Sequence, residues 1–168
     1  MRHAKLPAAL LSILPALLPA AACGPVRFDL DRPVLLRAAP AEVPESFVAS
    51  LRAAIEQLGG TEGAGEGAQP IEVRFERVLT VGGAEVDGGV DRLRNDVIVV
   101  SARGAALPPA ELRALAAHEL GHCLGAVHLP DCRGVNVMAQ GCAPESPGYS
   151  ADDVADVCRN TVGGVCGR

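Results

Sequence analysis

Three of the four histidines in this chain fall within eleven consecutive residues, and their spacing strongly restricts how that segment can fold. His118 and His122 are four residues apart, so a helix over residues 112–124 would direct both side chains to one side, about 6 Å apart along the axis. Gly125 is expected to end this helix, because glycine adopts the left-handed conformation in which the chain can reverse. That reversal would return His128 to the same side.

Imidazoles that converge on one point can bind zinc, with zinc–nitrogen distances of about 2.0–2.1 Å. Three protein ligands leave a fourth position for water, which is typical of catalytic zinc sites. Glu119 directly follows His118, so its carboxylate would flank the ion and could accept a proton from the water. The segment predicts His118, His122 and His128 as ligands and Glu119 as general base. A buried helix with three incidental histidines is the alternative.

The pattern H-E-x-x-H-x-x-G-x-x-H over residues 118–128, with Met138 ten residues further on, resembles the metzincin metalloendopeptidases. The resemblance implies an α+β fold: one domain, residues 23–168, with a twisted mixed sheet over an active-site helix, a methionine turn beneath the ligands and a C-terminal helix. It also implies a zinc-dependent endopeptidase acting on proteins or peptides, and we expect a monomer. The matrixin branch is the nearest; Gln140 is not the tyrosine of astacin- and serralysin-like enzymes, and Leu129 fits no common branch.

Apolar spacing predicts the other elements of the domain. Residues 34–37 and the alternating residues 71–75 indicate strands, and the β-branched run 97–100 indicates a strand covered on both faces. Residues 44–58 predict a helix, because apolar residues recur every three or four positions after a proline. Two further prolines, Pro108 and its neighbour, are expected to start the helix that carries the histidines.

Ser150 and Asp153 are spaced as in a capping box and predict the start of the C-terminal helix. We expect Asp152, Asp153 and Asp156 to form a solvated acidic face there rather than to bind metal. Tyr149, the only tyrosine, lies where the resemblance places the wall of the substrate cleft. It would either contact substrate or, the interpretation we prefer, pack beneath that wall.

Residues 82–91 are rich in glycine, and matrixins carry calcium and a structural zinc at the corresponding place. This segment has no histidine, so a second zinc is not expected. Ca2+ bound through Asp87 or Asp91 is one interpretation of the segment. A tight solvated turn is the other, and the one we favour.

Residues 1–22 have the features of an export signal, with Arg2 and Lys5 before an apolar run and three alanines before Cys23. The run is too short and too interrupted by proline to span a bilayer. Ala-Ala-Cys-Gly resembles a lipobox, so Cys23 would anchor an outer-membrane or cell-surface lipoprotein. Release into the periplasm or the medium is the alternative. Membrane contact is expected only through this anchor.

Six cysteines in an exported chain indicate disulfide bonds. We expect two bridges between cysteines close in sequence: Cys132 with Cys142, and Cys158 with Cys166. Cys123 would then be a buried thiol, or would pair with Cys23 if no lipid is attached. It projects about 100° from His122 on the helix, so it is not expected to bind the zinc.

Composition argues against nucleic-acid binding. Removing Arg2 and Lys5 with the leader leaves 13 basic and 20 acidic residues, and no basic stripe is present. Aromatic residues make up 2% of the chain, so the core must consist of Leu, Val, Ile and Ala. A non-proteolytic zinc-binding lipoprotein of the cell envelope and an adhesive envelope domain are the alternatives to a peptidase.

Overall fold

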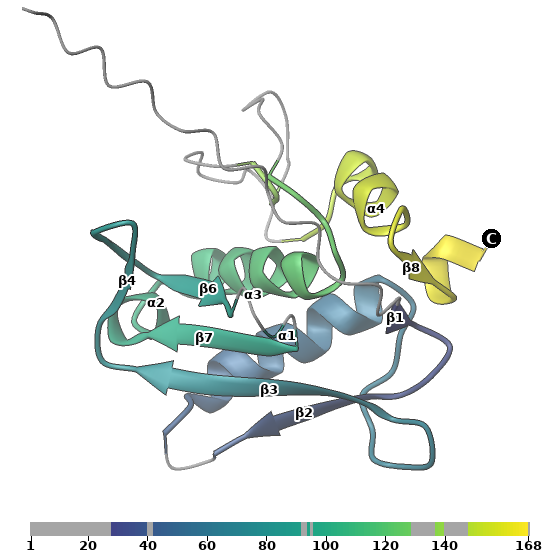
Figure 1. Cartoon of the computed structure of the whole chain (residues 1–168), viewed down its shortest axis with the longest axis horizontal. Coiled ribbons are helices and arrows are strands. Elements are labelled where there is room, and N and C mark those ends of the chain that lie inside the picture. The colour runs from purple at the N-terminus through teal and green to yellow at the C-terminus, as the bar shows by residue number, and fades with distance from the viewer. Residues whose placement is uncertain are drawn as a thin grey trace, which may run out of the picture.

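A computed structural model describes residues 28–39, 42–91, 94, 96–128, 137–139 and 148–167. Several predictions lie outside these residues: the leader, the lipidated Cys23, the bridge between Cys132 and Cys142, and the positions of Leu129 and Gln140. Within the described ranges, none of the helices combines the length and apolar character needed to cross a bilayer. The described residues form a mixed α+β domain (Figure 1).

A four-stranded mixed sheet in the order β2-β3-β7-β6 is the base of the domain (Figure 1). Three strands are parallel and the last is antiparallel at the edge: β2 (Val34–Ala38), β3 (Gln69–Glu76), β7 (Val97–Ser101) and β6 (Gly88–Val90). Every residue of β7 is buried, as its β-branched run predicts. The three strands predicted from the sequence are therefore confirmed.

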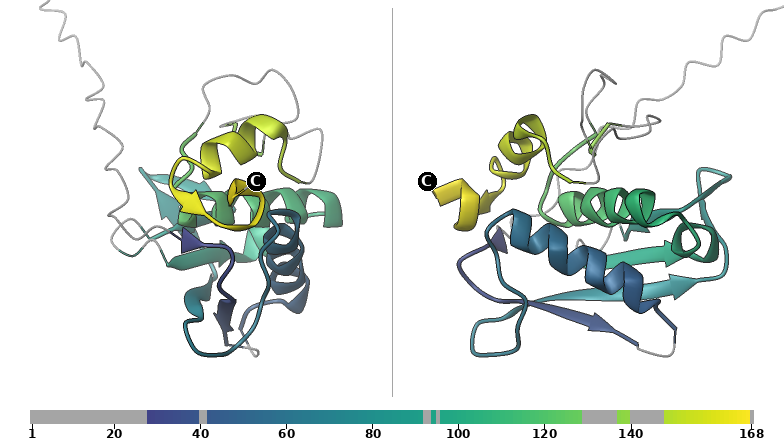
Figure 2. Two further views of the ribbon diagram at one scale, coloured as in Figure 1. Left: turned by 90° about the vertical axis from the view of Figure 1, so that its right-hand side faces the viewer. Right: turned by 180° about the vertical axis from the view of Figure 1, so that it is seen from behind.

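Two long helices, α1 (Glu45–Gln57) and α3 (Pro109–Cys123), lie on the same face of the sheet (Figure 2). Each follows a proline, and α1 ends before Gly59, whose φ is +76°. The core between helices and sheet is mainly aliphatic, and its largest fully buried side chains include Phe47, Leu51, Ile55, Ile71, Ile98 and Leu120. The predicted helices are confirmed. The core is mainly Leu, Val, Ile and Ala as predicted, but it also contains Phe28, Phe47, Met138 and Tyr149.

The glycine-rich residues 82–91 form more structure than a turn. Gly82 and Gly83, both with positive φ, connect β4 (Leu79–Val81) to β5 (Ala84–Val86), and β6 follows as an edge strand. The turn interpretation is right at the two glycines and wrong for β6, whose pairing with β7 depends on tertiary contacts. The carboxylate of Asp87 pairs with Arg103 at 2.5 Å, and calcium binding remains an untested prediction.

The short helix α2 (Ala102–Ala105) lies between β7 and α3. The C-terminal part, after α3, contains α4 (Ala151–Val157), β8 (Thr161–Val162) and the 3-10 helix η1 (Gly164–Gly167). β8 pairs in parallel with β1 (Phe28–Asp29). Ser150 and Asp153 form the predicted capping box, and Cys158 and Cys166 form the predicted disulfide. The predicted solvated acidic face is wrong, because only Asp152 is exposed while Asp153 and Asp156 are buried.

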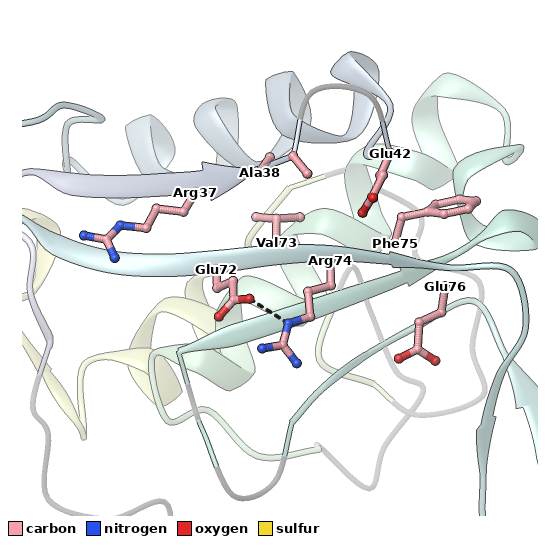
Figure 3. A pocket seen from close by; sticks show the side chains of 9 residues that line it. Arg37, Ala38, Glu42, Glu72, Val73, Arg74, Phe75 and Glu76 are labelled. Carbon is pink, nitrogen blue, oxygen red and sulfur yellow. Dashed lines mark hydrogen bonds and ion pairs between the residues drawn. The ribbon is translucent and has the colours of Figure 1, made fainter.

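A charged depression lies at the ends of β2 and β3, where Arg37, Glu72, Arg74 and Glu76 point away from α1 (Figure 3). Arg74 donates to Glu72 at 2.7 Å, and this hydrogen bond holds the pKa of the Glu72 carboxyl below its usual value. The charge of Glu72 is therefore neutralised by Arg74. No residue lining the depression belongs to the histidine cluster, so we assign it no part in the candidate site.

Candidate metal centre

α3 ends where the sequence predicts, shortly after its second histidine. Gly125 has a φ of +89°, and its N–H donates to the carbonyl of His122 at 3.0 Å. The N–H of Ala126 donates to the carbonyl of Gly121 at 2.9 Å, which completes the hydrogen-bond pattern of a Schellman motif. The chain reverses at this cap and brings His128 beside the helix.

The three histidines converge on one point. The distances between their Nε2 atoms are 3.1 Å from His118 to His122, 3.2 Å from His118 to His128 and 3.0 Å from His122 to His128. Nitrogens bound at about 2.0–2.1 Å around a tetrahedral ion would be about 3.3 Å apart. Within the described part of the chain, this is the only group of three or more His, Cys, Asp or Glu residues able to hold a metal ion. The cluster therefore fits zinc.

Backbone carbonyls determine which nitrogen of each helical histidine carries the proton. Nδ1 of His118 lies 2.5 Å from the carbonyl oxygen of Val137, and Nδ1 of His122 lies 3.0 Å from that of Ala126. A carbonyl only accepts, so each Nδ1 donates and each Nε2 presents a lone pair. Two lone pairs that face each other repel unless a cation lies between them. The two carbonyls thus orient the rings as metal ligands.

Burial keeps the cluster neutral. It lowers the pKa of His122 to about 4, and repulsion from His118 and His128 adds to the effect. Burial also lowers the pKa of His118. His128 is more exposed, and its pKa is lowered by partial desolvation of the ring together with repulsion from His118. Neutral imidazole is the form that binds metals, so all three histidines are ready to bind at neutral pH.

Glu119 follows His118 in the chain, and its side chain is buried against the edge strand β6. The residue is 4% exposed, and its Oε2 atom is buried with no hydrogen-bond partner among the described residues. Its other oxygen lies against the edge strand, since a Cβ added at Gly88 would be 3.1 Å from Oε1. Burial raises the pKa of Glu119 to about 8. A buried carboxyl group with an oxygen that lacks a partner and with a raised pKa is typical of functional sites.

Met138 supports the helix from below. It is completely buried, and a Cβ added at Gly121 would lie only 2.5 Å from its sulfur atom. Gly121 immediately precedes the second histidine, so the glycine allows the methionine to pack directly beneath the ligands. Only residues 137–139 of this region are described, and the methionine turn as a whole remains a prediction.

Gly121→Ala should destabilise the protein, because the added methyl group would lie 2.5 Å from the sulfur of the completely buried Met138, so this side chain would have to shift within the core. Overpacking a core typically costs about 1–3 kcal/mol, and the better helix propensity of alanine offsets up to about 1 kcal/mol of that. We expect a lower midpoint in urea denaturation. Gly65→Ala is the matched control, because a Cβ there meets nothing within 4 Å. Equal midpoints for Gly121→Ala and wild type would contradict the close packing.

Asp153 is a buried residue next to the candidate site whose contacts the sequence interpretation missed. Its buried carboxylate accepts the N–H groups of Val137 and Met138, both at 3.1 Å, in addition to its capping contact. The carbonyl of Val137 in turn accepts from His118, so Asp153 helps to orient the first ligand. One signal was available: Val157 lies four residues after Asp153, so a helix that buries one also buries the other.

Two further residues, Tyr149 and Cys123, are buried at α3 without belonging to the ligand cluster. The hydroxyl of Tyr149 donates to the carbonyl of Ala117 at 2.6 Å, and burial raises its pKa well above its ordinary value. This contact agrees with the interpretation that Tyr149 packs rather than contacts substrate. Cys123 is a buried thiol, as expected, and it is not part of the ligand cluster.

The chain has little detectable similarity to known proteins in sequence. No protein-family model matches it, and no curated protein matches it. Among solved structures, it is similar to metalloproteinase-II from Bacteroides fragilis, with 14% sequence identity and a TM-score of 0.46. The match covers 86% of this chain and 56% of that protein, so this chain spans little more than half of that protein's length.

Proposed function

We propose that the chain is a zinc-dependent endopeptidase of the metzincin type. The observation that carries this proposal is the triangle of three Nε2 atoms beside a buried glutamate, Glu119, whose Oε2 atom has no described partner. A purely structural zinc site has four protein ligands, whereas three ligands with an adjacent acid–base group are typical of catalytic sites. Met138 would serve as the floor of the site, without binding the ion.

His118, His122 and His128 would hold the zinc ion. When bound there, zinc would supply Lewis-acid chemistry: it polarises a substrate carbonyl and lowers the pKa of a water molecule. Glu119 would take a proton from the attacking water and pass it to the nitrogen of the leaving amine. Burial raises the pKa of this carboxyl group towards neutral pH. A group whose pKa is near the working pH can both accept and donate a proton, as this mechanism requires.

The edge strand β6 supports a peptide as substrate. β6 pairs only with β7 among the described strands, so its outer edge can offer N–H and C=O groups to an extended chain. Gly88 of this strand lies against Glu119, which places the edge next to the proposed general base. A peptide bound there as an additional strand would pass close to the histidine cluster.

A peptidase assay with and without a chelator tests the proposal. The purified domain, residues 23–168, should cleave members of a peptide library, lose that activity with a chelator and regain it when zinc is added. The alternative is a zinc-binding lipoprotein of the cell envelope without proteolytic activity. Full zinc occupancy without cleavage of any peptide would favour this alternative.

A further inference from the structure

We propose that residues 156–166, here called the C-terminal clamp, position the third histidine and thereby set how tightly the site holds its metal. The inference rests on the proposed metal centre and adds a positioning element that lies outside the ligand motif. Its starting point is the segment of residues 124–127, which connects the second ligand, His122, to the third, His128. His128 is exposed, so burial alone does not fix its position.

Three side chains of the clamp form hydrogen bonds with the backbone of this segment. The hydroxyl of Thr161 donates to the carbonyl of Leu124 at 3.0 Å. The amide of Asn160 donates to the carbonyl of Gly125 at 2.9 Å. The carboxylate of Asp156 accepts the N–H of Val127, directly before the third ligand, at 2.8 Å. Each contact therefore comes from a different clamp residue to a different residue of the segment.

The Thr161 contact is buried, the Asp156 contact is partly buried and the Asn160 contact is exposed. Thr161 is 3% exposed and Leu124 is 2% exposed, so loss of the Thr161 hydroxyl would leave the Leu124 carbonyl without water to replace it. The Asp156 side chain is itself buried, at 2% exposed. Arg159 forms an ion pair with Asp156 on the same helix end. A Cβ added at Gly125 would lie 2.7 Å from that of Asn160, so the clamp approaches the cap of α3 as closely as a glycine permits.

The clamp is itself held firmly to the rest of the domain. The disulfide between Cys158 and Cys166 closes it, and β8 within it pairs with β1. The N–H of Gly164 donates to Asp31, and the N–H of Val165 donates to the carbonyl of Leu58 beyond the end of α1, both at 2.9 Å. In Figure 1 the clamp occupies the end of the domain marked C, next to β1. The segment before His128 is thus connected through the clamp to the core.

Removal of a clamp contact should weaken zinc binding without removing a ligand. Groups that orient metal ligands typically contribute 10- to 100-fold in affinity. We expect this loss for Asp156→Ala and for Thr161→Val, which keeps the shape of threonine but not its hydroxyl. Asp156→Asn and Thr161→Ser retain the acceptor oxygen and the hydroxyl, so each should restore affinity to within a few-fold of wild type.

The experiment measures zinc affinity by competition with a chromophoric chelator and records the visible spectrum of the cobalt(II)-substituted protein. The spectrum reports ligand geometry, which a purely structural role for the clamp would not change. Asp152→Asn is the matched control, because Asp152 is exposed on the same helix. It should leave both readouts unchanged. The double variant Cys158→Ser with Cys166→Ser should weaken zinc binding in the same direction as the clamp variants.

The outcomes separate the clamp from the metal centre. Wild-type affinity and an unaltered cobalt spectrum in folded Asp156→Ala and Thr161→Val would overturn the clamp but leave the metal centre intact. Absence of zinc binding by the wild-type protein would overturn both. If Asp156→Ala does not fold, Thr161→Val and the double serine variant decide the question by the same two readouts.

Discussion

Glu119→Gln should lower kcat/KM for a cleaved peptide by roughly 10²–10⁴-fold, the usual contribution of general-base catalysis, while zinc remains bound. Glutamine has nearly the same shape as glutamate but cannot accept a proton from water. The Glu119 side chain packs against Gly88, so there is little space there for another group to act as the base. Peptide cleavage measured together with zinc content checks the prediction. Near wild-type turnover by the variant would refute the role of Glu119.

A matched control for Glu119→Gln is Glu111→Gln, which removes an exposed carboxylate from the first turn of the same helix. It should leave peptide cleavage unchanged.

Stability of the metal-free protein gives a second readout for Glu119→Gln. Because burial raises the pKa of Glu119 from 4.5 to about 8, the folded state binds this proton more tightly than the unfolded chain. As the pH rises from about 4.5 to about 8, Glu119 ionises in the unfolded chain but stays protonated in the folded state. The free energy of unfolding of the metal-free wild type therefore falls progressively over this range. The glutamine variant lacks this dependence. It should be the more stable protein at pH 8, and the difference should disappear below pH 4.5.

His118→Ala and His122→Ala should each lose most of the zinc, whereas the wild-type domain should carry about one ion per chain. Removal of one imidazole leaves two ligands, and His118→Ala also leaves the carbonyl of Val137 without its donor. Metal analysis of the purified proteins tests this. Arg113→Ala changes an exposed residue of the same helix and should keep the ion. Undiminished zinc in both histidine variants would contradict the ligand assignment.

The elements that the sequence predicted correctly depend on interactions over a few residues. Pro108 and Gly125 mark the two ends of α3 through the preferences of their own backbone, and Ser150 and Asp153 cap α4 across three residues. The convergence of the histidines has the same origin. It follows from a four-residue helical spacing and one left-handed glycine, both of which are visible in the linear pattern.

Only the tertiary structure decided which polar groups support this site. Asp153 and Asp156 belong to an ordinary acidic helix start in the sequence, yet their carboxylates accept N–H groups that lie 15 to 29 residues away in the chain. β6 likewise becomes a strand because it pairs with the buried β7. The donors that stabilise these two buried carboxylates lie far away in the chain, and a local pattern of residue types carries no information about them.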